Sequence, residues 1–556
     1  MTWAALLLLA PGIYAAIGLG SLRLVGAHRE RLSLAPLVGL VASGWLPLLA
    51  LALGGVPFFV SGALLALGVL GAATGAGLPR AMLAREGARL YSCYVAGLLF
   101  LALAATPAPG LWGTDWAMYV RAGEALLSYA ADPAAFDALP ALVADRPRLF
   151  AARPHLFSAA IAPLSAGLPA LLALEVLSAV AGASLLLAVG FAARRVGREE
   201  PSGLWLVFFL SLPLYTYHLL ALWPKFMAAA SVLVALSEGY AYRAERTRST
   251  WLWAWGWLGV AIAVHHASLL YLPLLVLLVW RGAEQRRVPL AGWAGVALLA
   301  TAGVYEFWAL STLGLEARVQ SNPSVYQATS FDLVFLLWKT AQQLFASVLG
   351  TGLPFAAGRL LAAPGAPLPI ALGHLSDALS GWLVFLAGTF AGNLFPLLVV
   401  AREELRRAWR EARGHPLFST VLLGFGVALL GASLLAPIVH LSAAQLGSMP
   451  SSVALVYFAS SRLARPKLLR ALWVSLAMGA LPLLAYLVAT RAAFERARSG
   501  DSFWLDWFLR FEGDARLLFA LDETTLSQAL SPLVLLALAA LLAVPLGVGL
   551  AAARRR

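Results

Sequence analysis

The first long polar stretch of this sequence holds an aspartate in a setting where a carboxylate can act as a base. Asp115 stands just after an apolar run, in the stretch Leu111-Trp-Gly-Thr-Asp115, and Tyr119 follows one helical turn later on the same face. Partial burial at the wall of an apolar cavity raises the pKa of a carboxyl group toward neutral pH, as general-base catalysis requires. Alternatively, Asp115 caps the helix that begins there by accepting a hydrogen bond from a free backbone N–H. Both roles fit the residues.

Basic side chains crowd the end of the same stretch. They are Arg146, Arg148, Arg153 and His155. A guanidinium group offers a planar pair of donors that matches a phosphate, so these residues are candidates for binding an anion. The alternative is that they pair with lipid headgroups or with the neighbouring aspartates, Asp132, Asp137 and Asp145.

Three further features bring polar groups to the ends of apolar runs. Lys225 lies in a short turn, where it either presents its ammonium group to a phosphate or extends along the interface into water. His265 and His266 are adjacent, so they point in different directions on a helix and do not form a two-histidine metal site on one face. Either histidine can hydrogen-bond a phosphate or a sugar, or cap a helix end. Glu306 lies near the end of an apolar run, and intramembrane carboxylates are functional candidates by default.

Composition identifies the elements that must position these residues. Of the 556 residues, 61% are hydrophobic and 12% are charged, whereas a soluble domain has about a quarter charged residues. Apolar runs of about 20 residues, the length of a helix that crosses the hydrocarbon core, recur along the chain without strand-like alternation. We therefore expect an all-α polytopic membrane protein with about 13–15 transmembrane helices. The predicted spans are 2–22, 34–54, 57–78, 91–108, 168–192, 203–221, 225–241, 251–264, 267–280, 288–311, 380–400, 416–439, 443–460, 471–490 and 531–551.

The basic residues predict an orientation for these spans. Arginine clusters fall on alternate loops, and short loops rich in arginine stay in the cytoplasm. The N-terminus is therefore expected outside and the C-terminus in the cytoplasm, so topology rather than nucleic acid explains the formal net charge of +13. Arginine far outnumbers lysine, as in GC-rich bacterial genomes, and we expect the bacterial inner membrane.

The run from Trp251 to Trp280 has basic residues on both flanks, so both ends should lie in the cytoplasm. We therefore expect two short helices with His265 and His266 at the turn between them. The alternative is one long, tilted helix.

Long segments on the expected outer side divide the chain into four parts. These outer segments are too short and too apolar to be separate soluble domains. Their mixture of aromatic and charged residues predicts helices that lie in the membrane interface. The parts are three N-terminal spans (1–90), a central module (91–311) with a first outer loop (109–167), a second outer segment (312–379), and C-terminal spans (380–556) with a third outer segment (491–530).

The order of these features resembles the GT-C fold of lipid-dependent membrane glycosyltransferases, which include protein O-mannosyltransferases and aminoarabinose transferases of lipid A. A span is followed by a long outer loop with an early aspartate, a basic element containing proline, five more membrane passes and another outer loop. The similar core runs from about Tyr91 to Ser311. The resemblance implies that a sugar leaves a polyprenyl phosphate or diphosphate with inversion, while Asp115 activates the acceptor hydroxyl.

The resemblance also suggests roles for the basic side chains. Arg146 and Arg148 match the basic end of the family's loop, where Arg153-Pro-His-Leu156 replaces the common Arg-Pro-Pro-Leu. Some members carry a second acidic pair and a divalent metal in the next outer loop, where this chain has Lys225. This implies a metal-independent site without other cofactors, in which cations neutralise the leaving phosphate. The remaining candidates for substrate binding are Tyr119, His155, His265, His266 and Glu306.

The partners implied are membrane lipid, a polyprenyl-phosphate-linked sugar and a glycan, lipid or protein acceptor, with no nucleic acid. A polysaccharide polymerase or O-antigen-ligase-like enzyme is one alternative, and it would use a late outer loop with Arg359 and His374. A transporter or flippase of lipid-linked substrates is another, although related halves and midplane charges, which such proteins often show, are not evident. No Walker A loop, no His-Glu-x-x-His and no Gly-x-Ser-x-Gly motif occurs.

Overall fold

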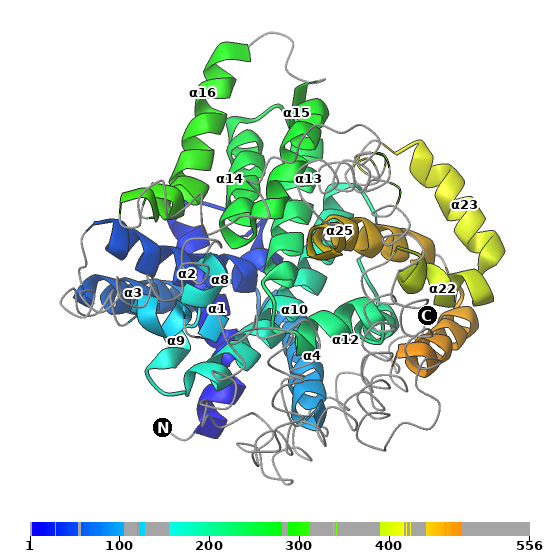
Figure 1. The fold of residues 1–556 in the computed structure, drawn as a ribbon, viewed down its shortest axis with the longest axis horizontal. Helices are drawn as coiled ribbons and strands as arrows, with labels where there is room; N and C mark the ends of the chain where they lie inside the picture. Colours follow the sequence, from blue (N-terminus) through cyan, green and yellow to red (C-terminus); the bar gives the residue numbers. More distant parts are fainter. Residues whose placement is uncertain are drawn as a thin grey trace.

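A computed structural model of the chain describes residues 3–27, 29–53, 57–104, 119–120, 122–127, 155–198, 200–280, 287–307, 309–311, 390–415, 441–461 and 463–479, and the single positions 337, 341, 417, 419 and 423. All regular elements in these residues are helical (Figure 1). They are α1 (Trp3–Leu24), η1 (Leu32–Leu34), α2 (Ala35–Ala52), α3 (Pro57–Ala76), α4 (Arg80–Ala104), α8 (Leu156–Ala159), α9 (Ala162–Ser165), α10 (Ala170–Arg195), α11 (Gly203–Leu210), α12 (Pro213–Leu220), α13 (Lys225–Glu245), α14 (Arg248–Val264), η3 (His266–Tyr271), α15 (Leu272–Trp280), α16 (Arg287–Leu298), η4 (Leu299–Gly303), α22 (Phe390–Val400), α23 (Arg402–Arg413) and α25 (Leu441–Ser460).

Five of the described helices are long and apolar enough to cross a membrane, and the bent pair α11 and α12 makes a sixth if it is counted as one span. The five are Trp3–Leu24, Leu32–Ala52, Phe59–Ala76, Ala170–Arg195 and Ala291–Ser311. Helical architecture and membrane character, as expected from the sequence, are therefore confirmed for the described part of the chain. The predicted span 531–551 and most of 416–439 lie outside the described residues.

Helix α10 forms the centre of the bundle. Nearly every side chain from Leu171 to Ala193 is buried, and the helix is apolar on all sides, as expected for a helix surrounded by others. Helices α4 and α13 pack against it. Helix α4 begins at Arg80, earlier than the predicted span at 91, because its arginine, alanine and glutamate residues continue the helix beyond the apolar run.

Glycines allow the three N-terminal helices to pack at very short range. A Cβ atom on Gly18 of α1 would lie 1.7 Å from the carbonyl oxygen of Ala35 in α2. A Cβ atom on Gly71 of α3 would lie 1.7 Å from the carbonyl oxygen of Ala16 in α1. The obstructing atoms are backbone, which cannot move aside as a side chain can. Small residues at such crossings are a common means of packing helices in membranes.

We expect the Gly71→Ala variant to be less stable than the unchanged protein by about 1–3 kcal/mol, because the added methyl forces α3 away from α1. The matched control is Gly68→Ala on the same helix, where a Cβ atom meets nothing within 4 Å. Thermal unfolding of both purified variants in detergent would measure the difference. Equal unfolding temperatures for the two variants would show that the close approach does not matter.

The bent pair α11 and α12 turns by 59° at a break between Leu210 and Pro213. Such a break leaves backbone groups without helical partners, which is costly inside a bundle. Residues from far along the chain satisfy two of them. The Asn393 side chain of α22 accepts a hydrogen bond from the backbone N–H of Leu214 (3.1 Å), and the Ser475 hydroxyl donates to the carbonyl oxygen of Ser211 (2.9 Å).

The chain reverses direction after α14. Arg248, at the start of α14, stacks on Trp293 of α16, while Gly259 lies against Thr301 further along, so α14 and α16 run in parallel. The chain must therefore return between them, and α15 does so beside the second half of α13, where Leu275 approaches Gly239. This agrees with the predicted pair of short helices and excludes a single long helix.

Connections that carry arginine meet at one end of the bundle, which we call the arginine end. Its most buried group is Glu238 of α13, which is fully buried. The Glu238 carboxylate accepts a hydrogen bond from Arg31, after α1, and another from Arg195, at the end of α10, each at 3.0 Å. The Arg31 guanidinium also lies 4.4 Å from the ring centre of Trp253 in α14. These contacts join the N-terminal helices to the centre of the bundle.

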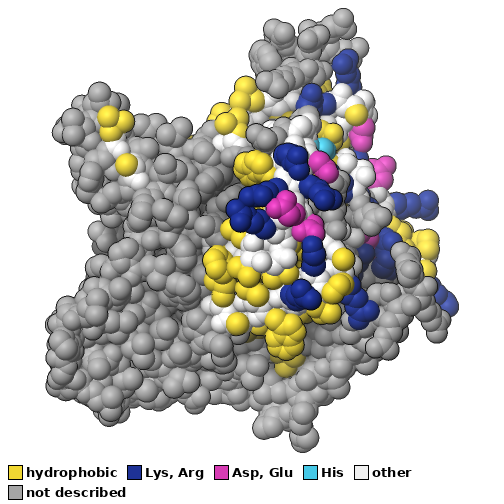
Figure 2. Space-filling model, turned by 90° about the vertical axis from the view of Figure 1, so that its right-hand side faces the viewer, with side chains coloured by type: hydrophobic (Ala, Val, Ile, Leu, Met, Phe, Trp, Pro, Cys, Tyr) yellow, Lys and Arg dark blue, Asp and Glu magenta, His cyan; other side chains and the backbone are white. Residues whose placement is uncertain are grey.

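A second ionic group lies at the same end. Glu200, which follows α10, accepts hydrogen bonds from Arg89 of α4 and from Arg194. Figure 2, which views the side of the molecule where α23 lies, shows basic and acidic side chains gathered beside hydrophobic ones. Arg31, Arg89, Arg194 and Arg195, which come from three of the basic clusters predicted to share one side of the membrane, therefore do meet in space.

Stability should depend on pH through Glu200. Burial raises the pKa of its carboxyl group, but hydrogen bonds and charges from Arg194 and Arg89 outweigh burial and hold the pKa below the ordinary value of 4.5. A depressed pKa contributes stability that is present above pH 4.5 and is lost as the pH falls through the lower, folded value. We therefore expect Glu200→Gln to lower the unfolding temperature at pH 7 and to have a smaller effect at pH 4. A Glu200→Gln effect that stays constant across this range would contradict this account.

Candidate functional site

The opposite end of the bundle holds several of the side chains selected from the sequence. Helix α14 leaves the arginine end and continues for 17 residues, about 25 Å at 1.5 Å per residue. It ends at His265, where the backbone becomes extended (φ −157°, ψ 118°). We call this end, with the residues described next, the histidine end: Tyr119, His155, His265, His266, Tyr305 and Glu306.

The two adjacent histidines make different contacts. The Nδ1 atom of His265 accepts a hydrogen bond from the backbone N–H of Ala267 at 3.3 Å and so caps η3. The Nε2 atom of His266 lies 3.4 Å from the Oε1 atom of Glu306, and both side chains are more than a third exposed. His265 therefore has the capping contact that the sequence left as an alternative, while His266 and Glu306 form an accessible pair of acid and base.

His155 reaches the same end from the first outer loop. It is buried, and its ring packs edge-on against Tyr305, with 5.5 Å between the ring centres. His155 precedes α8, a short helix that is buried in the bundle because its side chains, Leu156 to Ala159, are all apolar or small. Helix α8 and α9 are held to α1 by the Tyr14 hydroxyl, which donates to the carbonyl oxygen of Ala160 at 2.7 Å.

Tyr119 lies at the other side of the same loop. Its ring is buried and packs edge-on against Phe157 of α8, with 5.9 Å between the ring centres. Four predicted residues are therefore linked, partly by contacts and partly by adjacency in sequence, because Phe157 follows His155 by two positions and Glu306 follows Tyr305. Tyr119 contacts α8, His155 precedes α8 and contacts Tyr305, and Glu306 contacts His266. Asp115, Arg146, Arg148 and Arg153 lie outside the described residues.

Lys225 belongs to a second buried group, at the N-terminal end of α13. It is only 2% exposed, so it does not extend along the interface into water, and its ammonium nitrogen lies 3.8 Å from the ring centre of Trp223. His218 of α12 is fully buried and accepts or donates one hydrogen bond, between Nδ1 and the carbonyl oxygen of Leu214 (2.7 Å). Its Nε2 atom has no hydrogen-bond partner among the described residues.

The turn that presents Lys225 has an unusual backbone. Leu222 adopts a positive φ of 50°, a conformation that favours glycine or asparagine. Such strain costs of the order of 1–3 kcal/mol and is concentrated at functional sites. Sequence patterns could not identify this feature, because leucine carries no signal for a left-handed turn.

Comparisons with protein-family models, with curated proteins and with solved structures found no match. Within the described ranges, no three His, Cys, Asp or Glu side chains are grouped so that they could hold a metal ion.

Proposed function

We propose that this protein is a membrane glycosyltransferase with a GT-C-like core at about residues 91–311. It would move a sugar from a polyprenyl phosphate or diphosphate to an acceptor hydroxyl, with inversion at the anomeric carbon. The 556 residues would have about 13–15 spans in a bacterial inner membrane, with the histidine end outside. Asp115 would be the base, and Arg146, Arg148, Arg153 and Lys225 would hold the phosphate.

The observation that carries this proposal is the convergence at the histidine end. Side chains from the two ends of the first outer loop, Tyr119 and His155, belong to the same connected group as His266 and Glu306 from later helices. Hydroxyl, imidazole and carboxylate groups all form hydrogen bonds with sugar hydroxyls, and hydroxyl and imidazole groups also donate to phosphates. Asp115 is only one helical turn from Tyr119 in sequence, which favours a base near this group.

Lys225 supports the phosphate role. An ammonium group is a compact point charge with three donors, which suits it to bind a phosphate. Lys225 is also the first residue of α13, where the helix dipole favours negative charge. The strained turn at Leu222 lies three residues before it.

The proposed reaction is a single displacement. The acceptor oxygen attacks the anomeric carbon as Asp115 takes the hydroxyl proton, and the new C–O bond forms as the bond from carbon to the phosphate oxygen breaks. The electron pair leaves with the polyprenyl phosphate, whose charge the lysine and arginines stabilise. Stabilisation of developing charge by fixed cations is commonly among the largest contributions to catalysis.

The test is transfer of a labelled sugar from a polyprenyl-phosphate donor by the purified full-length protein in proteoliposomes, with the configuration of the product read by NMR. An inverted glycosidic product supports the proposal. Movement of the donor between leaflets without a covalent product would instead identify a flippase. Chain extension that is lost in Arg359→Ala and His374→Ala, but not in Asp115→Asn, would identify a polymerase or ligase.

A further inference from the structure

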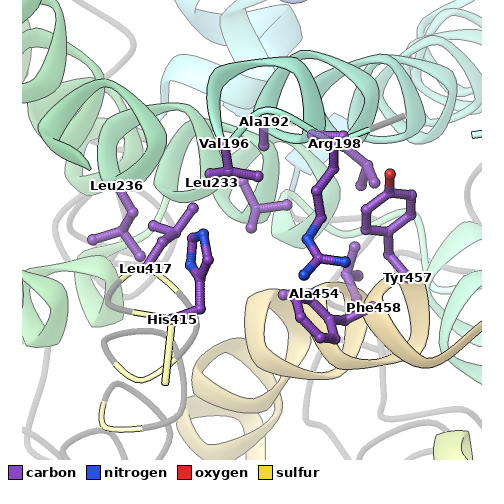
Figure 3. Close-up of a pocket in the computed structure, with 13 residues that line it drawn as sticks. Ala192, Val196, Arg198, Leu233, Leu236, His415, Leu417, Ala454, Tyr457 and Phe458 are labelled. Atoms are coloured by element: carbon purple, nitrogen blue, oxygen red, sulfur yellow. The ribbon is translucent and has the colours of Figure 1, made fainter. Parts of the chain in front are cut away.

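A cavity of about 60 Å³ lies near the arginine end, away from the histidine end. It is surrounded by the end of α10, the middle of α13, α25 and the segment after α23 (Figure 3). Figure 3 shows Arg198 and His415 on two sides of this space, with Val196 and Leu233 between them.

The lining decides what kind of molecule fits. Almost all of its surface is apolar and comes from side chains such as Val189, Leu236, Val453 and Ala454. The volume is several times the roughly 10–15 Å³ that one water needs, but a buried water also needs two to four polar partners. An apolar cavity of this kind favours hydrocarbon over water.

The rim adds a positive charge. The Arg198 guanidinium lies over the ring of Phe458, 3.8 Å from its centre. The His415 ring stacks on Tyr240, with 5.2 Å between centres. Burial, and then the charge of Arg198, lower the pKa of His415 below 6.5, so its imidazole is neutral at pH 7 and can hydrogen-bond while Arg198 carries the charge.

The helix that leads to His415 extends this positive surface. Helix α23 is amphipathic: Leu405 and Ala408 are buried, whereas the exposed positions are mainly arginine. The exposed arginines are Arg402, Arg406, Arg407 and Arg410. A basic amphipathic helix beside membrane-spanning helices is typical of a surface that lies against anionic lipid headgroups.

We propose that this cavity holds a few carbon atoms of one acyl chain of an anionic phospholipid, whose phosphate is bound by Arg198 and His415. The occupant is anionic rather than zwitterionic because the rim and α23 both present cations. It is a membrane lipid because α10, which lines the cavity, is long and apolar enough to cross a bilayer. This site is separate from the proposed transfer site and does not depend on it.

The test uses the full-length protein in phosphatidylcholine nanodiscs that contain a trace of phosphatidylglycerol with a photoactivatable diazirine on one acyl chain. After illumination, mass spectrometry locates the adducts. We expect adducts in α10, α13 and α25 at the cavity, and competition by unlabelled phosphatidylglycerol but not by added phosphatidylcholine. We expect Arg198→Gln to reduce the labelling about tenfold, the loss of a charge-assisted contact. The matched control is Arg248→Gln, because Arg248 stacks on Trp293 outside the cavity.

A second variant tests the cavity itself. Ala454→Phe should fill the space and remove the adducts, and Arg198→Gln keeps the test decisive if Ala454→Phe does not fold. Equal labelling by a phosphatidylcholine probe would overturn the anionic assignment. Unchanged labelling in both variants, or adducts confined to other helices, would overturn the site. The lipid site would also be overturned if native mass spectrometry showed a dimer that covers the cavity and that is lost in the Ala454→Phe variant.

Discussion

The Asp115→Asn variant is expected to transfer sugar about 10²- to 10⁴-fold more slowly than the unchanged protein, the range that a general base contributes. Asparagine keeps the size of the side chain but cannot accept the proton of the acceptor hydroxyl. The loss should therefore appear in kcat, while KM for the lipid-linked donor changes little, because the phosphate is held by other residues.

The matched control for this prediction is Asp137→Asn, which removes the same charge from the same outer segment. It should retain full activity. If Asp115 only caps a helix, both variants should keep their turnover, and Asp115→Asn should lose at most a modest amount of stability, about 1 kcal/mol. Full turnover in Asp115→Asn would remove the proposed base.

The Glu238→Ala variant is expected to lose about 3–5 kcal/mol of stability, the cost of leaving a buried charge without its counter-ion. Glu238 is fully buried between Arg31 and Arg195, so its removal leaves the guanidinium of Arg31, which is only 2% exposed, without its buried partner and with the exposed Glu30 at 3.3 Å. Glu238→Gln, which keeps a hydrogen-bond acceptor, should lose less. Unfolding temperatures in detergent, together with the yield of folded protein, would measure both.

The control for this prediction uses the same arginine. Glu245→Ala removes the other acidic partner of Arg195, 2.7 Å away, from a pair that is partly exposed to solvent. Exposed pairs contribute at most about 1 kcal/mol, so this variant should be close to the unchanged protein. If Glu238→Ala unfolds no earlier than Glu245→Ala, the buried triad does not join the N-terminal helices to the core.

Patterns along the sequence predicted how the helices are arranged better than they predicted where a helix is broken. Alternating arginine clusters correctly predicted that Arg31, Arg89 and Arg195 share one end, because charge separation follows from the cost of moving cations through hydrocarbon. The same argument predicted the reversal at His265. In contrast, the apolar run 203–221 was predicted as one continuous span, although the structure breaks it into α11 and α12. Pro213, at which α12 begins, is the residue that could have indicated the break.

Parts of the candidate site could be anticipated and others could not. Residue type and position near the ends of apolar runs selected His155, His266 and Glu306, and the structure places His155 against Tyr305 and His266 against the next residue, Glu306. The strained turn at Leu222 carries no sequence signal. Nor does the placement of Arg198 and His415 on the wall of one cavity, since 217 positions separate them and only tertiary packing brings them to it.

The hydrogen bonds at the break between α11 and α12 have a consequence for how the protein is made. Residues 211 to 214 leave the ribosome long before Asn393 and Ser475, the side chains that satisfy their backbone groups. Chains fold progressively from the N-terminus during synthesis, so this kink must wait, unsatisfied or served by water, until Asn393 and Ser475 have been synthesised. The bundle can therefore reach its final form only after Ser475 has been inserted, and nascent chains that stall earlier should be substrates for membrane quality control.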